Sequence, residues 1–327
     1  MAFVLLDCAV GTELARRGVD VERPGWTAAA IVEAPEVLRA VHAEAIAAGA
    51  DVLTANTFRT HAVNVQPLGC EAATLTQRAV AIAREAVAQH EQSTRYEPDE
   101  PNEPNEQGEP NEASERLPVR VFGSVAPVAD CYDAAAVPSD ERLAEAHAGH
   151  AEHLADAGVD GVLIETMTTT RELRIAIAAN RAAGERVNGT WRNGASQTGP
   201  RPVWASVAIR PDGRLYSGER FDNAIAVALQ EGATAVLANC FPATIGQQLA
   251  ATLARCCEPT GTPWGLQANT GRLTAAGTWA DDGDTSPAAY AGHAAAWRAA
   301  GAQLIGGCCG TTPEHLRTIR AAIARMS

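Results

Sequence analysis

Two adjacent cysteines near the C-terminal end of the chain, Cys308 and Cys309, lie inside the glycine-rich run 306–312. We expect the flanking glycines to let the backbone bend so that both sulfurs face one object. Thiolates bind soft metals, and Zn²⁺ takes them in tetrahedral geometry. Two sulfurs are too few for such a site, so the chain must supply a third ligand from elsewhere.

Short apolar segments alternate along the whole chain with stretches whose apolar residues have helical spacing. The pattern predicts strands at residues 3–6, 51–55, 119–123, 161–164, 203–209, 235–238, 264–267 and 302–305. It predicts helices at 35–48, 69–90, 140–157, from 169 onward, and at 222–231, 245–257, 287–299 and 313–325. Each of the eight predicted strands is therefore followed along the chain by a predicted helix.

The turns between these elements also repeat. Gly49, Gly158, Gly232 and Gly301 each follow a predicted helix and precede a predicted strand, as helix-capping glycines do. Strand–helix units in series predict a parallel sheet closed into a (β/α)₈ TIM barrel, with residues 1–327 as a single domain. A doubly wound open sheet is the rival. It is less favoured, because no Gly-x-Gly-x-x-Gly follows the first strand.

Two segments interrupt the alternation. Residues 91–117 are acidic and Pro-rich, which predicts a disordered insertion, and residues 184–202 form a polar, Gly-rich loop insertion. Both follow a helix and precede a strand. In a barrel they lie on the N-terminal face, away from the active site, and we predict that neither has a catalytic role.

The barrel also sorts the cysteines. Cys240 follows the sixth predicted strand as Cys308 and Cys309 follow the eighth, so all three lie on the C-terminal face, where active sites form. A second adjacent pair, Cys256 and Cys257, is at the close of a predicted helix, so we expect it at the end of the barrel opposite the active site. Three thiolates with an open fourth position describe a catalytic zinc site rather than a structural one.

Composition limits the classes of partner and the compartment. The net charge is −13 and every basic side chain apart from histidine is Arg, so we expect no nucleic-acid partner. No run approaches the roughly 20 apolar residues of a membrane span, and no signal peptide is visible. Eight cysteines without secretion signals indicate thiols or metal in a reducing cytoplasm. The oligomeric state is left open.

Motifs across the chain carry a resemblance to a known family. They are the segments 6–14, 49–58, 123–127 and 165–167, the pair Asn239-Cys240, and the run 306–311. The sequence resembles the homocysteine S-methyltransferases, which include betaine- and S-methylmethionine-dependent enzymes and the homocysteine module of methionine synthase. The resemblance implies a (β/α)₈ barrel with Zn²⁺ on Cys240, Cys308 and Cys309. It implies methyl transfer from a small donor to the thiol of L-homocysteine, giving methionine.

Polar residues at predicted strand ends are candidate substrate contacts. Glu165, with support from the resemblance, takes the substrate ammonium, or else forms a salt bridge at the barrel mouth. Asp7 binds the same ammonium or orients its loop, and the backbone amides around Gly11 and Thr12 hold the carboxylate. The remaining candidates either contact substrate or tie loops together: Asn56, Ser124 and Asn239.

One residue departs from the family pattern. Cys8 stands where the family usually has a glycine after the aspartate of the first loop. Its side chain either narrows the pocket, requires a different backbone conformation, or adds a thiol near the metal.

The methyl donor is the least determined feature. A stand-alone chain of this length favours a small donor such as S-methylmethionine. No Asp-x-His-x-x-Gly cobalamin signature is present, so a corrinoid would arrive on a separate partner protein. The alternative from another class is a zinc-thiolate protein on a barrel scaffold that binds thiols or senses metal without transferring methyl groups.

Overall fold

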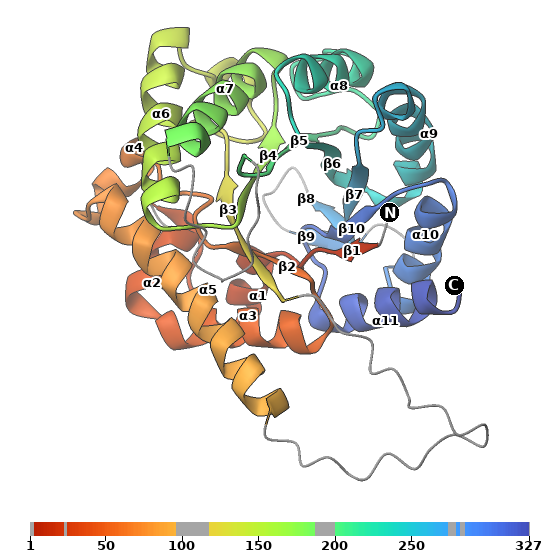
Figure 1. Ribbon diagram of the computed structural model, residues 1–327, viewed down its shortest axis with the longest axis horizontal. Coiled ribbons are helices and arrows are strands. Elements are labelled where there is room, and N and C mark those ends of the chain that lie inside the picture. The colour runs from red at the N-terminus through yellow and green to blue at the C-terminus, as the bar shows by residue number, and fades with distance from the viewer. Residues whose placement is uncertain are drawn as a thin grey trace.

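The strands close into a ring. The computed structural model describes residues 3–22, 25–95, 118–186, 200–273, 279–281 and 285–326, and within them eight parallel strands pair in the order β1-β10-β7-β6-β5-β4-β3-β2 (Figure 1). They are β1 (Val4–Leu5), β2 (Val52–Ala55), β3 (Arg120–Val125), β4 (Gly161–Met167), β5 (Val203–Ala208), β6 (Ala235–Pro242), β7 (Trp264–Asn269) and β10 (Leu304–Gly307). A bridge between Leu6 and Val52 joins the two ends of the sheet. The predicted (β/α)₈ barrel is confirmed.

Helices cover the outside of the ring (Figure 1). They are α1 (Val10–Arg16), α2 (Ala30–Glu33), α3 (Pro35–Ala47), α4 (Ala62–Val65), α5 (Ala72–Arg95), α6 (Asp140–Asp156), α7 (Thr170–Arg186), α8 (Phe221–Gln230), α9 (Gly246–Cys257), α10 (Pro287–Ala299) and α11 (Pro313–Ala324). The four predicted capping glycines have positive φ, which only glycine adopts without strain.

Alternate strand residues face inward and fill the barrel. The interior cluster includes Leu6, Phe122, Leu163 and Trp204, and the rings of Phe122 and Trp204 are 4.4 Å apart. Gly161 makes room for this packing, because a Cβ there would lie 2.3 Å from the Phe122 ring. The interior is therefore a packed core rather than a channel, and in such barrels active sites form at the carboxyl ends of the strands.

Several element boundaries differ from the prediction. Helix α5 continues to Arg95 and α7 to Arg186, so the first residues of both predicted insertions are helical. The remainder, residues 96–117 and 187–199, lies outside the described residues. An antiparallel hairpin of β8 (Gly271–Leu273) and β9 (Trp279–Asp281) follows β7 and was not predicted.

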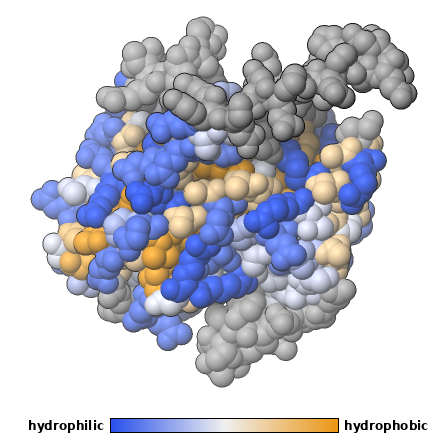
Figure 2. Space-filling view, turned by 90° about the horizontal axis from the view of Figure 1, so that it is seen from below, coloured by the Kyte–Doolittle hydropathy of each residue, from blue (hydrophilic) through white to orange (hydrophobic). Residues whose placement is uncertain are grey.

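The surface is mixed in character. Figure 2 shows one side of the molecule, on which hydrophilic side chains predominate and hydrophobic ones gather in smaller patches. Among the described helices, none is both long enough and apolar enough to cross a bilayer.

Candidate active site

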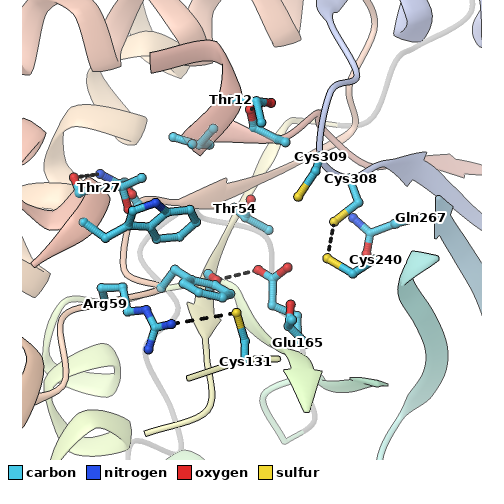
Figure 3. A pocket seen from close by; sticks show the side chains of 18 of the residues that line it. Thr12, Thr27, Thr54, Arg59, Cys131, Glu165, Cys240, Gln267, Cys308 and Cys309 are labelled. Atoms are coloured by element: carbon cyan, nitrogen blue, oxygen red, sulfur yellow. Dashed lines mark hydrogen bonds between the residues drawn. The ribbon is translucent and has the colours of Figure 1, made fainter. Parts of the chain in front are cut away.

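A cavity of about 560 Å³ opens at the carboxyl ends of the strands (Figure 3). Its walls come from residues at or just after β1, β2, β3, β4, β6, β7 and β10. This is the end at which TIM-barrel enzymes build their active sites, and the volume lies within the range of small-molecule sites.

Three sulfurs meet at one wall of this cavity. The Sγ atoms of Cys240, Cys308 and Cys309 all lie within 4.8 Å of one another, and those of Cys240 and Cys308 are 3.0 Å apart. Cys240 and Cys308 are buried and Cys309 is partly exposed. Among the described residues this is the one group of three His, Cys, Asp or Glu side chains whose ligand atoms lie this close together.

Backbone hydrogen bonds hold the cysteine pair after β10. The Cys308 amide donates to Ala268 O at 2.9 Å, and the carbonyl of Cys309 accepts from Thr270 N at 3.0 Å. The preceding glycines serve close packing. A Cβ on Gly307 would lie 2.1 Å from the Thr311 hydroxyl oxygen, and one on Gly306 would lie 2.7 Å from the Leu6 Cβ. Neither of these two positions has a positive φ, so they need glycine for space. Gly310, after the pair, has a φ of 84°, so the bend expected of the flanking glycines occurs there.

Backbone strain is concentrated at the cavity. Among the described residues other than glycine, three have positive φ: Trp26 at 47°, Thr166 at 61° and Cys240 at 55°. All three line the cavity. Thr166 and Cys240 also lie at register shifts in β4 and β6. Such conformations cost about 1–3 kcal/mol each and persist where the surrounding structure enforces them, commonly at functional sites.

Asn239 supports these two strained positions. Its Oδ1 accepts hydrogen bonds from Thr166 N at 3.0 Å and Ser206 Oγ at 2.8 Å, and its Nδ2 donates to Thr166 Oγ1 at 2.8 Å. The same Nδ2 lies 3.7 Å from Cys240 Sγ and 3.9 Å from Cys308 Sγ. Asn239 is fully buried and does not line the cavity. The structure therefore places it behind the sulfurs rather than beside a substrate.

Two carboxyl groups lie on the cavity wall. Asp7 accepts from Thr54 N at 2.7 Å, and Glu165 Oε1 accepts from Ser124 Oγ at 2.5 Å. Burial raises the pKa of Asp7 to about 8, with a contribution from the nearby charge of Glu165. Burial likewise raises the pKa of Glu165 to about 8. A cation between them would restore the charged form of both, so the pair is suited to an ammonium group.

The other predicted substrate contacts also line the cavity, mostly with their polar groups engaged. Asn56 Nδ2 donates to Thr27 O at 2.8 Å, and Ser124 binds Glu165. Thr12 Oγ1 accepts from Gly310 N at 3.2 Å, which links the first loop to the cysteine loop. Gly11 faces the Trp26 ring, 3.0 Å from where its Cβ would be.

The prediction missed several cavity residues. Gln267 is 4% exposed beside the cysteines, and its Oε1 has no hydrogen-bond partner among the described residues (Figure 3). As a polar residue ending an apolar strand, it carried a signal that sequence reasoning could have used. The cavity is also lined by side chains from loops, for which no such signal exists: Trp26, Phe58, Arg59 and Tyr132. Cys131 lines it too, on the face that its place after the third predicted strand indicates. The Tyr132 hydroxyl lies 3.7 Å from Cys240 Sγ.

The remaining cysteines lie outside the cluster. Cys8 is 3% exposed, belongs to the hydrophobic core cluster and borders the cavity, and burial raises the pKa of its thiol well above the ordinary value. Cys257 is fully buried in the core between the sheet and the helices, and the partly buried Cys256 packs against the same core. All eight cysteines fall within the described residues, and none forms a disulfide.

A buried polar cluster lies behind the loops that follow β2 and β3. His150 Nε2 lies 3.0 Å from Thr60 Oγ1, and the ring of His61 packs 4.1 Å from that of His150. Glu172 Oε1 accepts from Val128 N at 2.7 Å and lies 3.1 Å from His147 Nε2. The cluster thereby anchors the loop that carries Phe58 and Arg59 and the loop that carries Cys131 and Tyr132.

Comparisons with known proteins agree with this architecture. The family model for homocysteine S-methyltransferase matches residues 4–323. The chain is 27% identical to homocysteine S-methyltransferase 4 of Zea mays, over 98% of this chain and 89% of that one. It is 25% identical to selenocysteine Se-methyltransferase of Brassica oleracea var. italica, over 97% and 88%.

A solved structure shares the fold. The metallated form of the homocysteine methyltransferase MmuM from Escherichia coli superposes with a TM-score of 0.73 at 24% identity, covering 98% of this chain and 96% of that chain. The family model spans nearly all of this sequence. The chain therefore belongs to the homocysteine S-methyltransferase family.

Proposed function

We propose that the protein transfers a methyl group from a small onium donor, with S-methylmethionine favoured, to the thiol of L-homocysteine, giving methionine. The observation that carries the proposal is the cluster of Cys240, Cys308 and Cys309 on a cavity that also holds the carboxyl pair Asp7 and Glu165. Sulfur ligands for the metal and an acidic pair for an amino-acid ammonium are what this reaction requires.

The three sulfurs fit a zinc ion. Zn–S bonds of about 2.3 Å in tetrahedral geometry separate the sulfurs by roughly 3.8 Å. The cluster spans no more than 4.8 Å, so small side-chain movements suffice. A purely thiolate donor set selects soft or borderline metals such as Zn²⁺ over Mg²⁺ or Ca²⁺. When bound, Zn²⁺ supplies Lewis acidity that lowers the pKa of an added thiol.

The chain's own residues bind and orient the reactants. Glu165 and Asp7 hold the ammonium of homocysteine, and the Ser124 hydroxyl fixes the Glu165 carboxylate. Asn239 and Tyr132 hold the cysteine sulfurs in place from behind and from the cavity side. The side chains of Asn56 and Thr12 join loops, as their hydrogen bonds support. The backbone amides of Gly11 and Thr12, in the first turn of α1, hold the carboxylate of homocysteine.

The reaction is a displacement at carbon. The acceptor sulfur, having released its proton to solvent, forms a bond to the methyl carbon. The bond from that carbon to the donor sulfur breaks, and its electron pair stays on the donor, which leaves as a neutral thioether. No general acid is needed for this leaving group, which agrees with a cavity whose two interior carboxyls face an ammonium instead.

The deciding experiment is a methyl-transfer assay with zinc analysis. Homocysteine and, because a relative is named for it, selenocysteine serve as acceptors. S-methylmethionine, betaine and methylcobalamin serve as donors. Methionine formation from S-methylmethionine supports the proposal. Transfer only from methylcobalamin would favour a corrinoid partner protein, and bound zinc without transfer from any donor would favour a thiol-binding or metal-sensing protein.

Domain organisation and location complete the proposal. We propose a single barrel domain over residues 1–327, with residues 91–117 and 184–202 as insertions at the N-terminal face. In support, α5 ends at Arg95 and α7 at Arg186, and the strands that come next, β3 and β5, begin at the barrel end opposite the cavity. We propose a cytoplasmic protein, on the evidence of free cysteines and a thiol-based site. Its charge of −13 supports the absence of a nucleic-acid partner.

A further inference from the structure

Acidic side chains outnumber basic ones around the cavity. The acidic lining residues are Asp7, Glu22, Asp130 and Glu165. Among the described lining residues, Arg59 has the only permanently cationic side chain, and it forms no ion pair with a described carboxylate. A solitary guanidinium in a cavity for two small molecules, one of them an amino acid, is a candidate anion-binding group.

Other contacts hold Arg59 in one orientation. Its Nη1 donates to Ala129 O at 2.8 Å and Pro127 O at 3.4 Å, and its Nη2 lies 3.8 Å from Cys131 Sγ. The guanidinium carbon lies 5.3 Å from the centre of the Phe58 ring and 6.0 Å from that of Trp26. Guanidinium has five N–H donors in a fixed fork. No described residue accepts a hydrogen bond from Nε, and Nε and Nη2 form one edge of the fork, which matches a carboxylate.

The position of Arg59 identifies which reactant it serves. In Figure 3, Arg59 and Cys131 lie on one side of the cavity, the three clustered cysteines lie on the other, and Glu165 lies between them. The acceptor must place its thiol at the cysteine sulfurs and its ammonium near Glu165. The acceptor then occupies the part of the cavity between the clustered cysteines and Glu165, so the donor takes the remaining part, on the Arg59 side.

The aromatic rings of the cavity suit a cationic donor. Trp26, Phe58 and Tyr132 line the cavity, and the ring centres of Trp26 and Phe58 lie 5.2 Å apart. Aromatic faces attract onium groups. A donor that carries a sulfonium or ammonium at one end and a carboxylate at the other would match the rings and Arg59 in turn.

We propose that Arg59 binds the carboxylate of the methyl donor, so that the donors of this protein are carboxylate-bearing onium compounds. The inference rests on the proposed function for the identity of the reaction. The binding contact itself is independent of turnover. Arg59 acts here as a specificity-determining residue.

The test compares two donors that differ only in the carboxylate. Isothermal titration calorimetry measures the Kd of S-methylmethionine and of its methyl ester on the wild type and on Arg59→Gln. A hydrogen-bonded ion pair of this kind contributes about 1.5–3 kcal/mol, which is roughly a 10- to 150-fold change in Kd. We expect Arg59→Gln to weaken the acid by that factor and to change the Kd of the ester by less than about threefold. Arg59→Lys should give an intermediate result, because it keeps the charge and loses the fork.

Arg171→Gln is the matched control, because Arg171 pairs with Asp140 at the surface and lies outside the cavity lining. Equal weakening of acid and ester by Arg59→Gln would overturn the proposal and leave Arg59 a loop support. Weakening of homocysteine instead would assign it to the acceptor. If Arg59→Gln does not fold, as judged by thermal melting, the acid-to-ester ratio of Arg59→Lys decides.

The outcomes separate this inference from the proposed function. Methyl transfer from S-methylmethionine with an unchanged KM in Arg59→Gln would keep the function and reject the inference. Binding that depends on the carboxylate and on Arg59, without methyl transfer from any donor, would keep the inference and reject the function.

Discussion

The sulfurs of Cys240 and Cys308 lie 3.0 Å apart although 68 positions separate the two residues in the chain. Cys240 lies within β6 in a left-handed conformation, and Cys308 follows β10 directly. Strand β7 runs between β6 and β10 in the sheet, so both sulfurs reach toward each other across it at the open end of the barrel.

Replacing either of these cysteines should abolish zinc binding and turnover together. Loss of a group that only supports a ligand costs roughly 10- to 100-fold in metal affinity or activity, so we expect Cys240→Ser and Cys308→Ser to lose more than about 100-fold. Metal content by plasma mass spectrometry and the initial rate of methionine formation measure the effect. Cys256→Ser, at the end of α9, is the control and should keep both. Full zinc content in Cys240→Ser would refute the ligand assignment.

Glu165→Gln should raise the KM for homocysteine while leaving zinc content intact. The amide oxygen can still accept from Ser124, so the substitution removes the charge and little else. A charged hydrogen bond to an ammonium contributes about 1.5–3 kcal/mol, so KM should rise at least about tenfold. Glu85→Gln, at an exposed surface pair with Arg39, is the matched control. An unchanged KM for homocysteine would refute the ammonium-binding role. It would leave Glu165 with a structural role, the hydrogen bond that joins β4 to Ser124 of β3.

Acid should destabilise the fold through its buried histidines. Burial lowers the pKa of His42 to about 4 and that of His150 to about 3, and it lowers the pKa of His61 as well. The unfolded chain, with a histidine pKa near 6.5, then binds more protons than the folded chain below that pH. The contribution of these histidines to the free energy of unfolding is therefore fully present above pH 6.5. It is lost as the pH falls toward the folded-state pKa values of about 4 and 3.

His42→Leu isolates part of this effect. From the shift to about 4, His42 alone should cost about 2 kcal/mol at pH 5 relative to pH 8. Urea unfolding at the two pH values should show a smaller loss in His42→Leu than in the wild type by that amount. His90→Leu, which replaces a partly exposed histidine on α5, should lose as much as the wild type. Identical losses in all three proteins would exclude His42 as a source of acid sensitivity.

Deleting residues 98–115 should leave the catalytic rate within about twofold. The deletion lies between the end of α5 at Arg95 and the start of β3 at Arg120, and β3 begins at the amino ends of the strands, opposite the cavity. Halving the number of residues that connect two elements changes the free energy of loop closure by only about 0.6 kcal/mol. The rate and KM for both substrates, with circular dichroism to confirm folding, measure the effect. A large loss of rate in a folded deletion variant would show that the segment takes part in the reaction.

Much of the fold was determined by patterns that are local in the sequence. Helical spacing followed by a glycine and an apolar run recurs, and each unit can only bury its apolar faces beside another such unit. The sequence therefore predicted the barrel, and it placed Cys240, Cys308 and Cys309 on the same face, because parallel strands share their carboxyl ends. It also predicted Asp7 and Glu165 at this face, where the structure has them.

Which strand-end side chains point into the cavity was decided only by the tertiary structure. Strand side chains alternate between faces, so the register shifts after Ile164 and Asn239 change which residues turn inward. At the second shift Cys240 faces the cavity while Asn239 is buried behind it, an outcome that no spacing rule indicates. Arg59 and Trp26 reach the cavity because loops from separate units pack together there. That packing depends on contacts between residues far apart in the chain, which a linear pattern does not contain.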